Sequence, residues 1–211
     1  MVLWRVIKFR KWFRPPFFIP WFLTWGKWKV SSEKSVFITF DDGPNKDTTP
    51  WLLNFCKENN VKVTFFWLGK NIDCLPEFVK LAKAAGHNVG SHGYDHINAF
   101  EEKKELVKMN IKKGLELVPD NIFRPPYGLL HFPLAKKLSK NTPIIMWSWL
   151  SYDWDKSIAD KRIIASLEKN IKPGDILVFH ENDNSEKRIK RIFPSIVKII
   201  HEKGLQTALI K

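Results

Sequence analysis

Short apolar runs alternate with longer amphipathic segments along most of this 211-residue chain, from Ser35 to the last residue. The apolar runs are rich in β-branched and aromatic side chains, as buried strands are. Predicted strands cover 36–40, 63–67, 88–91, 122–124, 144–149, 176–179 and 206–210, and predicted helices cover 49–59, 76–85, 100–118, 134–138, 158–170 and 194–203. Strands that alternate with helices predict an α/β fold whose parallel sheet is either open or closed into a barrel.

Single residues set the expected ends of two of these helices. Thr49 is the expected N-cap of the first helix, with Pro50 at its first helical position, where the missing N–H of proline costs nothing. The last helix is expected to begin at Pro194 and to end before Gly204, a residue type common just after helix ends.

The composition excludes several classes of protein. Thirty-five basic and 22 acidic residues give a net charge of +13, and 44% of the residues are hydrophobic. These values exclude an acidic disordered chain, and the length is sufficient for one well-buried core. Only two cysteines are present, which excludes a disulfide-stapled mini-fold and a four-cysteine zinc module.

The first part of the chain differs from the rest. Residues 1–30 hold no acid, five tryptophans and seven bases: Arg5, Lys8, Arg10, Lys11, Arg14, Lys27 and Lys29. We therefore expect a basic, Trp-rich N-terminal arm over 1–34 and a single domain over 35–211. The arm has two interpretations. It is a membrane-surface anchor, with aromatic rings at headgroup depth and bases facing anionic lipid, or a strap whose aromatic side chains pack on the domain.

Neither a membrane-spanning segment nor a signal peptide is evident in the arm. Its longest apolar run, 17–24, has eight residues and contains Pro20, whereas a spanning helix needs about 20 residues. A small-residue cleavage site is also missing. We therefore expect a cytoplasmic or peripheral-membrane protein rather than a secreted one. Basic and aromatic residues can also bind nucleic acid, but that interpretation of the arm is weaker, so we expect no nucleic-acid partner.

Potentially reactive side chains follow the predicted strands at their carboxyl ends. In chain order they are Asp41, Asp42, His92, His96, Arg124, Asp153 and His180. In parallel α/β folds the carboxyl ends of the strands meet at one edge, which is where functional residues gather. The sequence therefore predicts one site that combines carboxylates, imidazoles and a guanidinium.

The residue types in the first two groups suit metal-assisted hydrolysis. Of two adjacent carboxylates, Asp41 and Asp42, one can bind a metal while the other accepts a proton, although Asp-Asp-Gly-Pro is also a common turn sequence. His92 and His96 converge if their segment makes one helical turn; the alternative is two unrelated surface histidines. Two histidines and one carboxylate leave open coordination positions, as catalytic zinc sites do.

The remaining groups suit charge stabilisation and proton donation. Two prolines after Arg124 restrict the backbone, which suits a fixed guanidinium and an N–H that stabilises an oxyanion, although a structural loop is the alternative. Asp153 is the expected partner of His180. Its carboxylate would raise the pKa of that imidazole and keep it able to donate a proton.

Taken together, five segments resemble the motifs of the polysaccharide deacetylase family (NodB homology, carbohydrate esterase family four). The segments are Thr39-Phe40-Asp41-Asp42-Gly43-Pro44, Ser91-His92 with His96, Arg124-Pro125-Pro126-Tyr127, Asp153-Trp154 and Val178-Phe179-His180. The resemblance covers about 35–211. It implies a distorted (β/α) barrel of about seven parallel strands in a single domain, a divalent metal that is usually Zn²⁺, and hydrolysis of acetyl groups from N-acetylated or, less often, O-acetylated sugars.

The resemblance also implies a role for each residue. The implied metal ligands are Asp42, His92 and His96, the general base is Asp41 and the general acid is His180. Arg124 would orient Asp41, Asp153 would orient His180, and the Tyr127 N–H would stabilise the oxyanion. Trp154 and Val178 would form the pocket wall that receives the acetyl methyl group.

Two positions depart from the family pattern and concern the substrate. Leu150 stands where the family usually has an aspartate, and Val178 stands where it usually has a leucine. We expect a monomer that acts on an N-acetylated glycan of the chitin or peptidoglycan type. The alternatives are a deformylase or deacetylase of a lipid-linked amino sugar and a weakly active glycan-binding relative.

Overall fold

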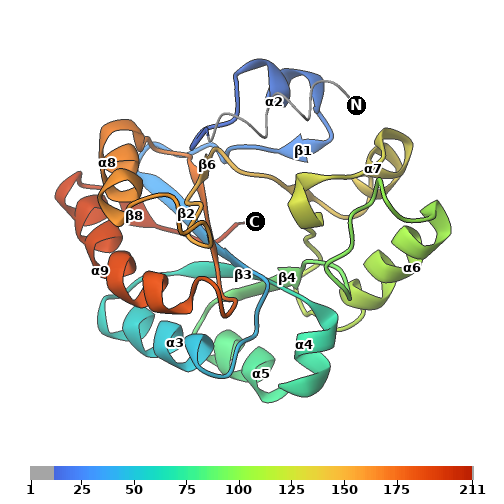
Figure 1. The fold of residues 1–211 in the computed structure, drawn as a ribbon, viewed down its shortest axis with the longest axis horizontal. Coiled ribbons are helices and arrows are strands. Elements are labelled where there is room, and N and C mark those ends of the chain that lie inside the picture. The colour runs from blue at the N-terminus through green and yellow to red at the C-terminus, as the bar shows by residue number, and fades with distance from the viewer. Residues whose placement is uncertain (1–11, 211) are drawn as a thin grey trace.

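A parallel sheet forms the centre of the computed structural model, which describes residues 12–210 (Figure 1). Its strands are β2 (Ser35–Asp41), β3 (Val63–Trp67), β4 (Asn88–Ser91), β6 (Trp149–Leu150) and β7 (Ile176–His180). They lie in the order β4-β3-β2-β7-β6, and every neighbouring pair is parallel. A further short strand, β8 (Gln206–Thr207), pairs with β2. The predicted α/β class with parallel strands is confirmed.

Helices surround this sheet in a ring (Figure 1). They are α3 (Thr48–Glu58), α4 (Gly69–Cys74), α5 (Glu77–Ala84), α6 (Lys104–Leu115), α7 (Phe132–Leu138), α8 (Asp160–Asn170) and α9 (Glu186–Glu202). The core between sheet and helices is aromatic at its centre, where the Phe40 ring lies 5.5 Å from that of Phe179 and 5.1 Å from that of Phe193. The buried aromatic and β-branched residues of β2, β3 and β7 thus meet the apolar face of α9.

The barrel is closed by one segment that changes partners. Its first part, β5 (Ile144–Ile145), pairs with β1 (Gly26–Lys27) of the arm, and Phe123 bridges it to β4. Its second part, β6, pairs with β7. The predicted strand 144–149 is therefore two short strands, and the predicted strand 122–124 is reduced to a single bridging residue. This side distorts the barrel, because its strands are only two residues long.

Residues 12–34 of the arm pack on the domain. The Phe13 ring stacks on Trp149 at 6.0 Å, and the Trp28 ring lies 6.1 Å from that of Trp147. Arg14 forms an ion pair with the fully buried Asp175. These contacts are the ones that the strap interpretation predicts for this part of the arm. The arm residues before Trp12 lie outside the described part of the chain.

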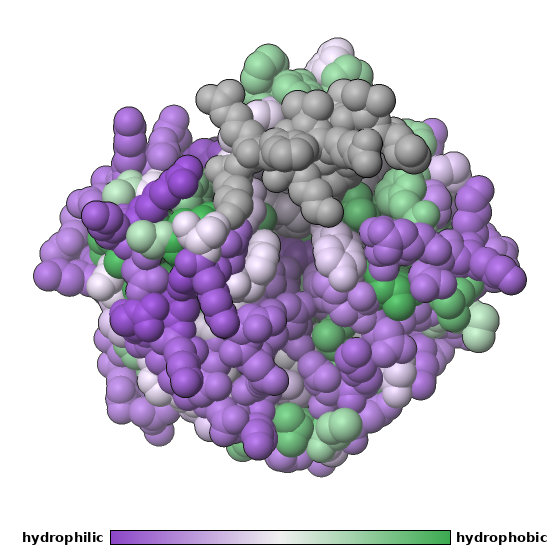
Figure 2. All heavy atoms as spheres, viewed as in Figure 1, coloured by the Kyte–Doolittle hydropathy of each residue, from purple (hydrophilic) through white to green (hydrophobic). Residues whose placement is uncertain are grey.

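One short helix of the arm nevertheless points aromatic side chains outward. In α2 (Phe18–Phe22) and just before it, Phe17, Trp21 and Phe22 are 89%, 72% and 64% exposed. Figure 2 shows apolar side chains gathered over this helix on a face that is otherwise mainly hydrophilic. Between residues 12 and 210, no helix combines the length and the hydropathy needed to cross a bilayer.

Several predicted helix boundaries are wrong for identifiable reasons. α3 begins at Thr48 after Asp47, and Thr49 is not its cap, because the Thr49 hydroxyl contacts the buried Glu181. α9 begins eight residues earlier than predicted and contains Pro194. A proline inside a helix costs about 3 kcal/mol, and the buried face of α9 outweighs that cost. α6 is shorter than the predicted 100–118, and α4 was not predicted.

Candidate active site

Asp41 ends strand β2 and is held by a buried arginine. Arg124 is fully buried and donates from Nη1 to Asp41 Oδ1 at 2.7 Å and to Thr39 Oγ1 at 2.6 Å. Its Nε and Nη2 donate to the main-chain oxygens of Ile145 and Met146 at 3.1 and 3.0 Å. Four acceptors thus fix the guanidinium, and the charge-assisted bond to Asp41 fixes the carboxylate.

The next residue, Asp42, presents one unpartnered oxygen. Its φ of 75° turns the chain, so that its carboxylate points differently from that of Asp41. Oδ2 accepts a hydrogen bond from Asn182 Nδ2 at 2.7 Å, whereas the buried Oδ1 has no hydrogen-bond partner. Burial opposes ionisation, but His180, His92 and His96 together hold the pKa of Asp42 below its ordinary value.

His92 and His96 converge on that oxygen. Asp42 Oδ1 lies 3.6 Å from His92 Nε2 and 3.4 Å from His96 Nε2. His92 Nδ1 lies 2.8 Å from the main-chain oxygen of Arg124, which fits an Nδ1–H donor and leaves Nε2 with its lone pair. The two histidines do not share a helical turn. Instead, the loop bends at Gly93, whose φ is 86°.

These three residues fit a divalent metal. Their ligand atoms all lie within 4.8 Å of one another. Burial, and then the neighbouring His92, lower the pKa of His96 to about 4, so its imidazole is neutral at neutral pH. Two imidazoles whose Nε2 atoms face a carboxylate with an unsatisfied buried oxygen form a donor set that suits Zn²⁺ and leaves room for water or substrate.

His180 ends strand β7 beside its expected partner. The β2–β7 register pairs His180 with Asp41, so both lie at the same edge of the sheet. Asp153 Oδ1 lies 2.8 Å from His180 Nδ1, and Asp153 Oδ2 accepts the His180 main-chain N–H at 2.8 Å. Burial alone would lower the pKa of His180, but the charge and hydrogen bond of Asp153 raise it to about 9. His180 is therefore protonated at neutral pH.

A pocket of about 440 Å³ opens over these groups. Besides the polar residues already described, its lining includes Tyr127, Gly128, Trp147, Leu150, Trp154 and Val178. Tyr127 and Gly128 have φ of 57° and 68°, which form a tight turn at its rim. The pocket thus has a charged floor and a largely apolar wall, and all ten residues selected from the sequence lie in or directly behind it.

Three further lining residues, Trp147, Asn182 and Asn184, were not anticipated. Asn182 lies two positions after His180, just beyond the end of β7, and its nearness in sequence to His180 is the signal that could have identified it. Trp147 packs so close to Gly128 that a Cβ there would overlap the ring. No pattern in the sequence indicates that contact.

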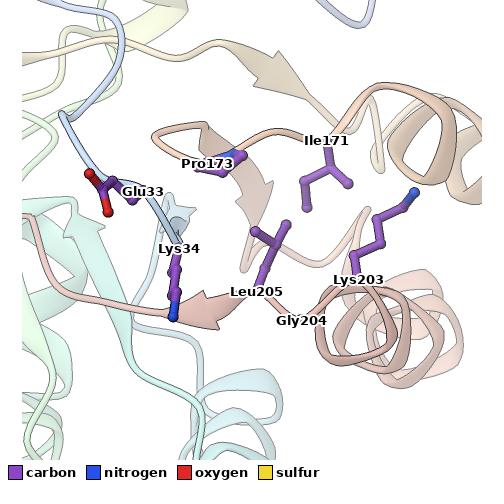
Figure 3. Close-up of a pocket in the computed structure, with 7 residues that line it drawn as sticks. All are labelled: Glu33, Lys34, Ile171, Pro173, Lys203, Gly204 and Leu205. Carbon is purple, nitrogen blue, oxygen red and sulfur yellow. The ribbon is translucent and has the colours of Figure 1, made fainter.

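Another hollow lies near the opposite ends of the strands, around Lys34, Lys203 and Glu33 (Figure 3). Its floor is formed by Ile171, Pro173 and Leu205. Figure 3 shows the charged groups of the three polar side chains pointing in different directions rather than toward one another. The hollow therefore has no converging polar groups of the kind that the site at the carboxyl ends has.

Known proteins resemble this chain in sequence and structure. The polysaccharide deacetylase family model matches residues 29–142. The peptidoglycan-N-acetylglucosamine deacetylase PgdA of Listeria monocytogenes is 34% identical over 162 residues, covering 72% of this chain and 34% of that protein, so the match spans about a third of that relative's length. A Bacillus cereus protein named peptidoglycan-N-acetylglucosamine deacetylase is 32% identical over 186 residues, covering 81% of this chain and 86% of that protein.

Among solved structures, the Bc1960 peptidoglycan N-acetylglucosamine deacetylase matches with a TM-score of 0.83 and 28% identity, covering 93% of this chain and 95% of that one. The expected distorted (β/α) barrel agrees with this likeness. Because the family model matches more than half of the chain, and because the Bacillus relative is matched over most of its length, this chain belongs to the polysaccharide deacetylase family.

Proposed function

We propose that the protein is a metal-dependent hydrolase that removes acetyl groups from N-acetylated sugars of a chitin- or peptidoglycan-type polysaccharide. The observation that carries this proposal is the convergence of Asp42, His92 and His96 between two buried pairs, Asp41–Arg124 and Asp153–His180. The names of the relatives support the substrate class. All these groups come from one chain, which supports a monomer as the working unit.

The ligand set and the base share the start of the reaction. Zn²⁺ bound by Asp42, His92 and His96 would polarise the amide carbonyl and lower the pKa of water from about 15.7 toward about 7. Asp41 is not needed as a ligand, because its carboxylate is held by Arg124. It therefore acts as the general base, which takes a proton from water as the water attacks the carbonyl carbon.

The acid and the pocket rim complete the reaction. The main-chain N–H of Tyr127 is the proposed donor to the oxyanion that forms on the acetyl group. His180, protonated through its contact with Asp153, donates its proton to the departing amine nitrogen. Trp154 and Val178 form the part of the wall on which the acetyl methyl group would rest.

Release of acetate or formate from a small substrate panel tests this proposal. The panel contains chitin oligomers, peptidoglycan, acetylated xylan and a lipid-linked N-acyl sugar, each with chelator and with re-added Zn²⁺. We expect acetate from chitin oligomers or peptidoglycan that stops with chelator and returns with Zn²⁺. Release only from the lipid-linked sugar would favour that alternative substrate. No release from any substrate of the panel, by protein that has bound Zn²⁺, would favour the glycan-binding alternative.

We also propose that the arm associates with anionic membrane surfaces. The exposed Phe17, Trp21 and Phe22 side chains on and beside α2 support this proposal, together with four bases that precede them in the sequence, Arg5, Lys8, Arg10 and Lys11. Aromatic rings would enter the headgroup region while the bases face the lipid phosphates. This location would bring the enzyme to a membrane-associated glycan.

Co-sedimentation with vesicles tests the membrane proposal. We expect binding to phosphatidylglycerol vesicles at low salt, weaker binding to phosphatidylcholine vesicles, and loss of binding in a Trp21→Ala/Phe22→Ala variant. Phe132→Ala, which removes an exposed aromatic side chain on α7, is the matched control. Equal pelleting of the double variant and the wild type would contradict the proposal.

A further inference from the structure

A buried carboxyl group that the proposed mechanism does not use lies directly after His180. Glu181 is fully buried, although glutamate is among the residues least often found in protein interiors. Transferring a carboxyl group out of water is costly unless hydrogen bonds compensate for it. The contacts of the Glu181 carboxyl group therefore indicate its role in the structure.

Both oxygens of Glu181 have partners from other elements. Trp67, at the end of β3, donates from Nε1 to Oε2 at 2.8 Å. The hydroxyl of Thr49, in the first turn of α3, is hydrogen-bonded to Oε1. One side chain thus joins the ends of β7 and β3 to the start of α3.

This carboxyl group also supports the turn that follows Asp42. A Cβ on Gly43 would lie only 2.6 Å from Glu181 Oε2, so the backbone of the turn rests directly on the carboxyl group. The Thr49 hydroxyl accepts the main-chain N–H of Asn45 at 2.8 Å, and Leu68 N–H donates to the Gly43 oxygen at 2.9 Å. The turn over 43–45 is therefore held by the Glu181 carboxyl group against Gly43 and by hydrogen bonds at Gly43 and Asn45.

The residues on either side of Glu181 face the site itself. The Glu181 main-chain N–H donates to the Asp41 oxygen at 2.9 Å, which continues the β2–β7 ladder beyond His180. Asn182 then donates to Asp42 Oδ2. β7 ends at His180, and the two residues that follow point to different sides: Asn182 contacts Asp42, and Glu181 lies against Gly43.

We propose that Glu181 is a positioning residue for the metal ligand Asp42, acting through the turn 43–45 that its carboxyl group supports. The inference rests on the proposed function, because it assigns Asp42 to the metal. It extends that function with a network, Trp67–Glu181–Thr49–Asn45, that touches neither metal nor substrate. Partners behind the ligands commonly hold a metal site in its binding geometry.

The protonation state of Glu181 identifies the conservative substitution. Burial raises the pKa of Glu181 to about 8, although its hydrogen bonds with Thr49 and Trp67 oppose that change. Because the Thr49 hydroxyl can either donate or accept, the amide of glutamine can accept from Trp67 Nε1 with its oxygen and donate to Thr49 Oγ1 with its nitrogen. Glu181→Gln should therefore keep the network, whereas Glu181→Met keeps the length of the side chain and removes both hydrogen bonds.

Zn²⁺ affinity of the full chain, measured by competition with a chromophoric chelator, is the primary measurement. We expect Glu181→Met to weaken Zn²⁺ binding about tenfold to 100-fold. The visible spectrum of bound Co²⁺ should change with it, because the position of a ligand changes. Acetate release should show a lower kcat with a nearly unchanged KM, and Glu181→Gln should restore all three measurements.

Leu167→Ala separates positioning from general destabilisation. Leu167 is fully buried on α8, away from the site, so this variant should lower the melting temperature and leave Zn²⁺ affinity unchanged. Glu181→Met protein that is folded and binds Zn²⁺ as tightly as the wild type overturns the inference. Wild-type protein that binds no Zn²⁺ overturns the proposed function, and the inference with it.

If Glu181→Met does not fold, the other ends of the network provide the test. Thr49→Val and Trp67→Phe each remove one of the two hydrogen bonds of Glu181; valine keeps the size of threonine, and phenylalanine keeps an aromatic ring but is smaller than tryptophan. We expect each to weaken Zn²⁺ binding and the double variant to weaken it further. A folded double variant with wild-type affinity overturns the inference.

Discussion

The two sides of the barrel differ in how their backbones are fixed. On one side, β2, β3, β4 and β7 are four to seven residues long and pair in continuous parallel ladders. On the other side, β5 and β6 have two residues each, and the arm supplies β1 to close the ring (Figure 1). We call the side formed by β2, β3, β4 and β7 the ladder side, and the side formed by β1, β5 and β6 the closure side.

The two sides supply different parts of the site. The ladder side ends in Asp41, Asp42 and His180, and His92 follows its strand β4. The closure side contributes most of the pocket wall, including Trp147 and Leu150, together with Asp153. Most of the groups that must meet at fixed distances thus follow the longer strands, whereas much of the substrate wall lies on and between strands of only two residues. This division predicts which substitutions abolish turnover and which do not.

The largest expected effect is on the ladder side, at a metal ligand. His92→Ala removes one of three ligand atoms, and we expect loss of both Zn²⁺ binding and turnover. Because a bound metal contributes several kcal/mol of transition-state stabilisation, kcat/KM should fall about 1,000-fold or more. Bound zinc per chain and acetate release measure the two effects. Zinc retained at one equivalent would show that His92 is not a ligand.

Removing the base should separate turnover from metal binding. In Asp41→Asn we expect kcat to fall about 100-fold to 10,000-fold, because the general base is lost. Zinc content should stay at the wild-type value, since Asp41 is held by Arg124 rather than by the ligand cluster. Glu168→Gln, the same change at an exposed acid on α8, is the control. Near-normal turnover of Asp41→Asn would mean that another group accepts the proton.

The acid joins the two sides, because His180 ends a ladder strand while its partner Asp153 follows β6. The pKa of His180 is raised to about 9, so kcat/KM should fall as the pH rises through about 9 and the proton is lost. Asp153→Asn removes the charge that raises the pKa. The alkaline limb should then move toward the ordinary value of 6.5, and if it reached that value only about a quarter of the molecules would carry the proton at pH 7, so the rate there should fall about fourfold. An alkaline limb that stays in place would assign it to a different group.

The same division explains how much the sequence could predict. On the ladder side, the strand patterns are strong, and every polar residue that follows a strand could be assigned to one edge of the sheet. The positions of Asp41, Asp42, His92 and His180 followed from that rule alone. The path between His92 and His96 did not, because the conformation of Gly93 is set by the surrounding contacts rather than by the spacing of two histidines.

On the closure side, local sequence was a weak guide. The segment 144–149 has the composition of one strand, yet its two ends pair with β1 and β7, which are far from it in the chain. The contact of Trp147 with the Gly128 turn likewise depends on residues far apart in the chain. Pro194 shows the same limit within a helix, because the burial of neighbouring residues outweighs a local preference.

The smallest expected effect concerns the closure of the barrel and involves stability rather than turnover. Arg14 and Asp175 form a pair in which Asp175 is fully buried, and Asp175 also contacts Lys29, Ser148 Oγ and the main-chain N–H of Lys172. Because these other contacts remain, we expect Arg14→Met to lower the free energy of unfolding by only about 1–3 kcal/mol at pH 7. Turnover per folded molecule should not change, since Asp175 precedes β7 and the reacting groups lie at the other end of that strand.

Urea denaturation of Arg14→Met at several pH values shows whether this pair fastens the arm. Burial opposes the charge of Asp175, but Arg14 and the other partners hold its pKa below the ordinary value of 3.8 in the folded protein. Stability from a lowered carboxyl pKa is present above the unfolded value and is lost as the pH falls through the folded value. The difference between wild type and variant should therefore be full at pH 7 and shrink below about pH 4. If kcat fell together with stability, the arm would take part in shaping the pocket, and the division between the two sides of the barrel would no longer hold.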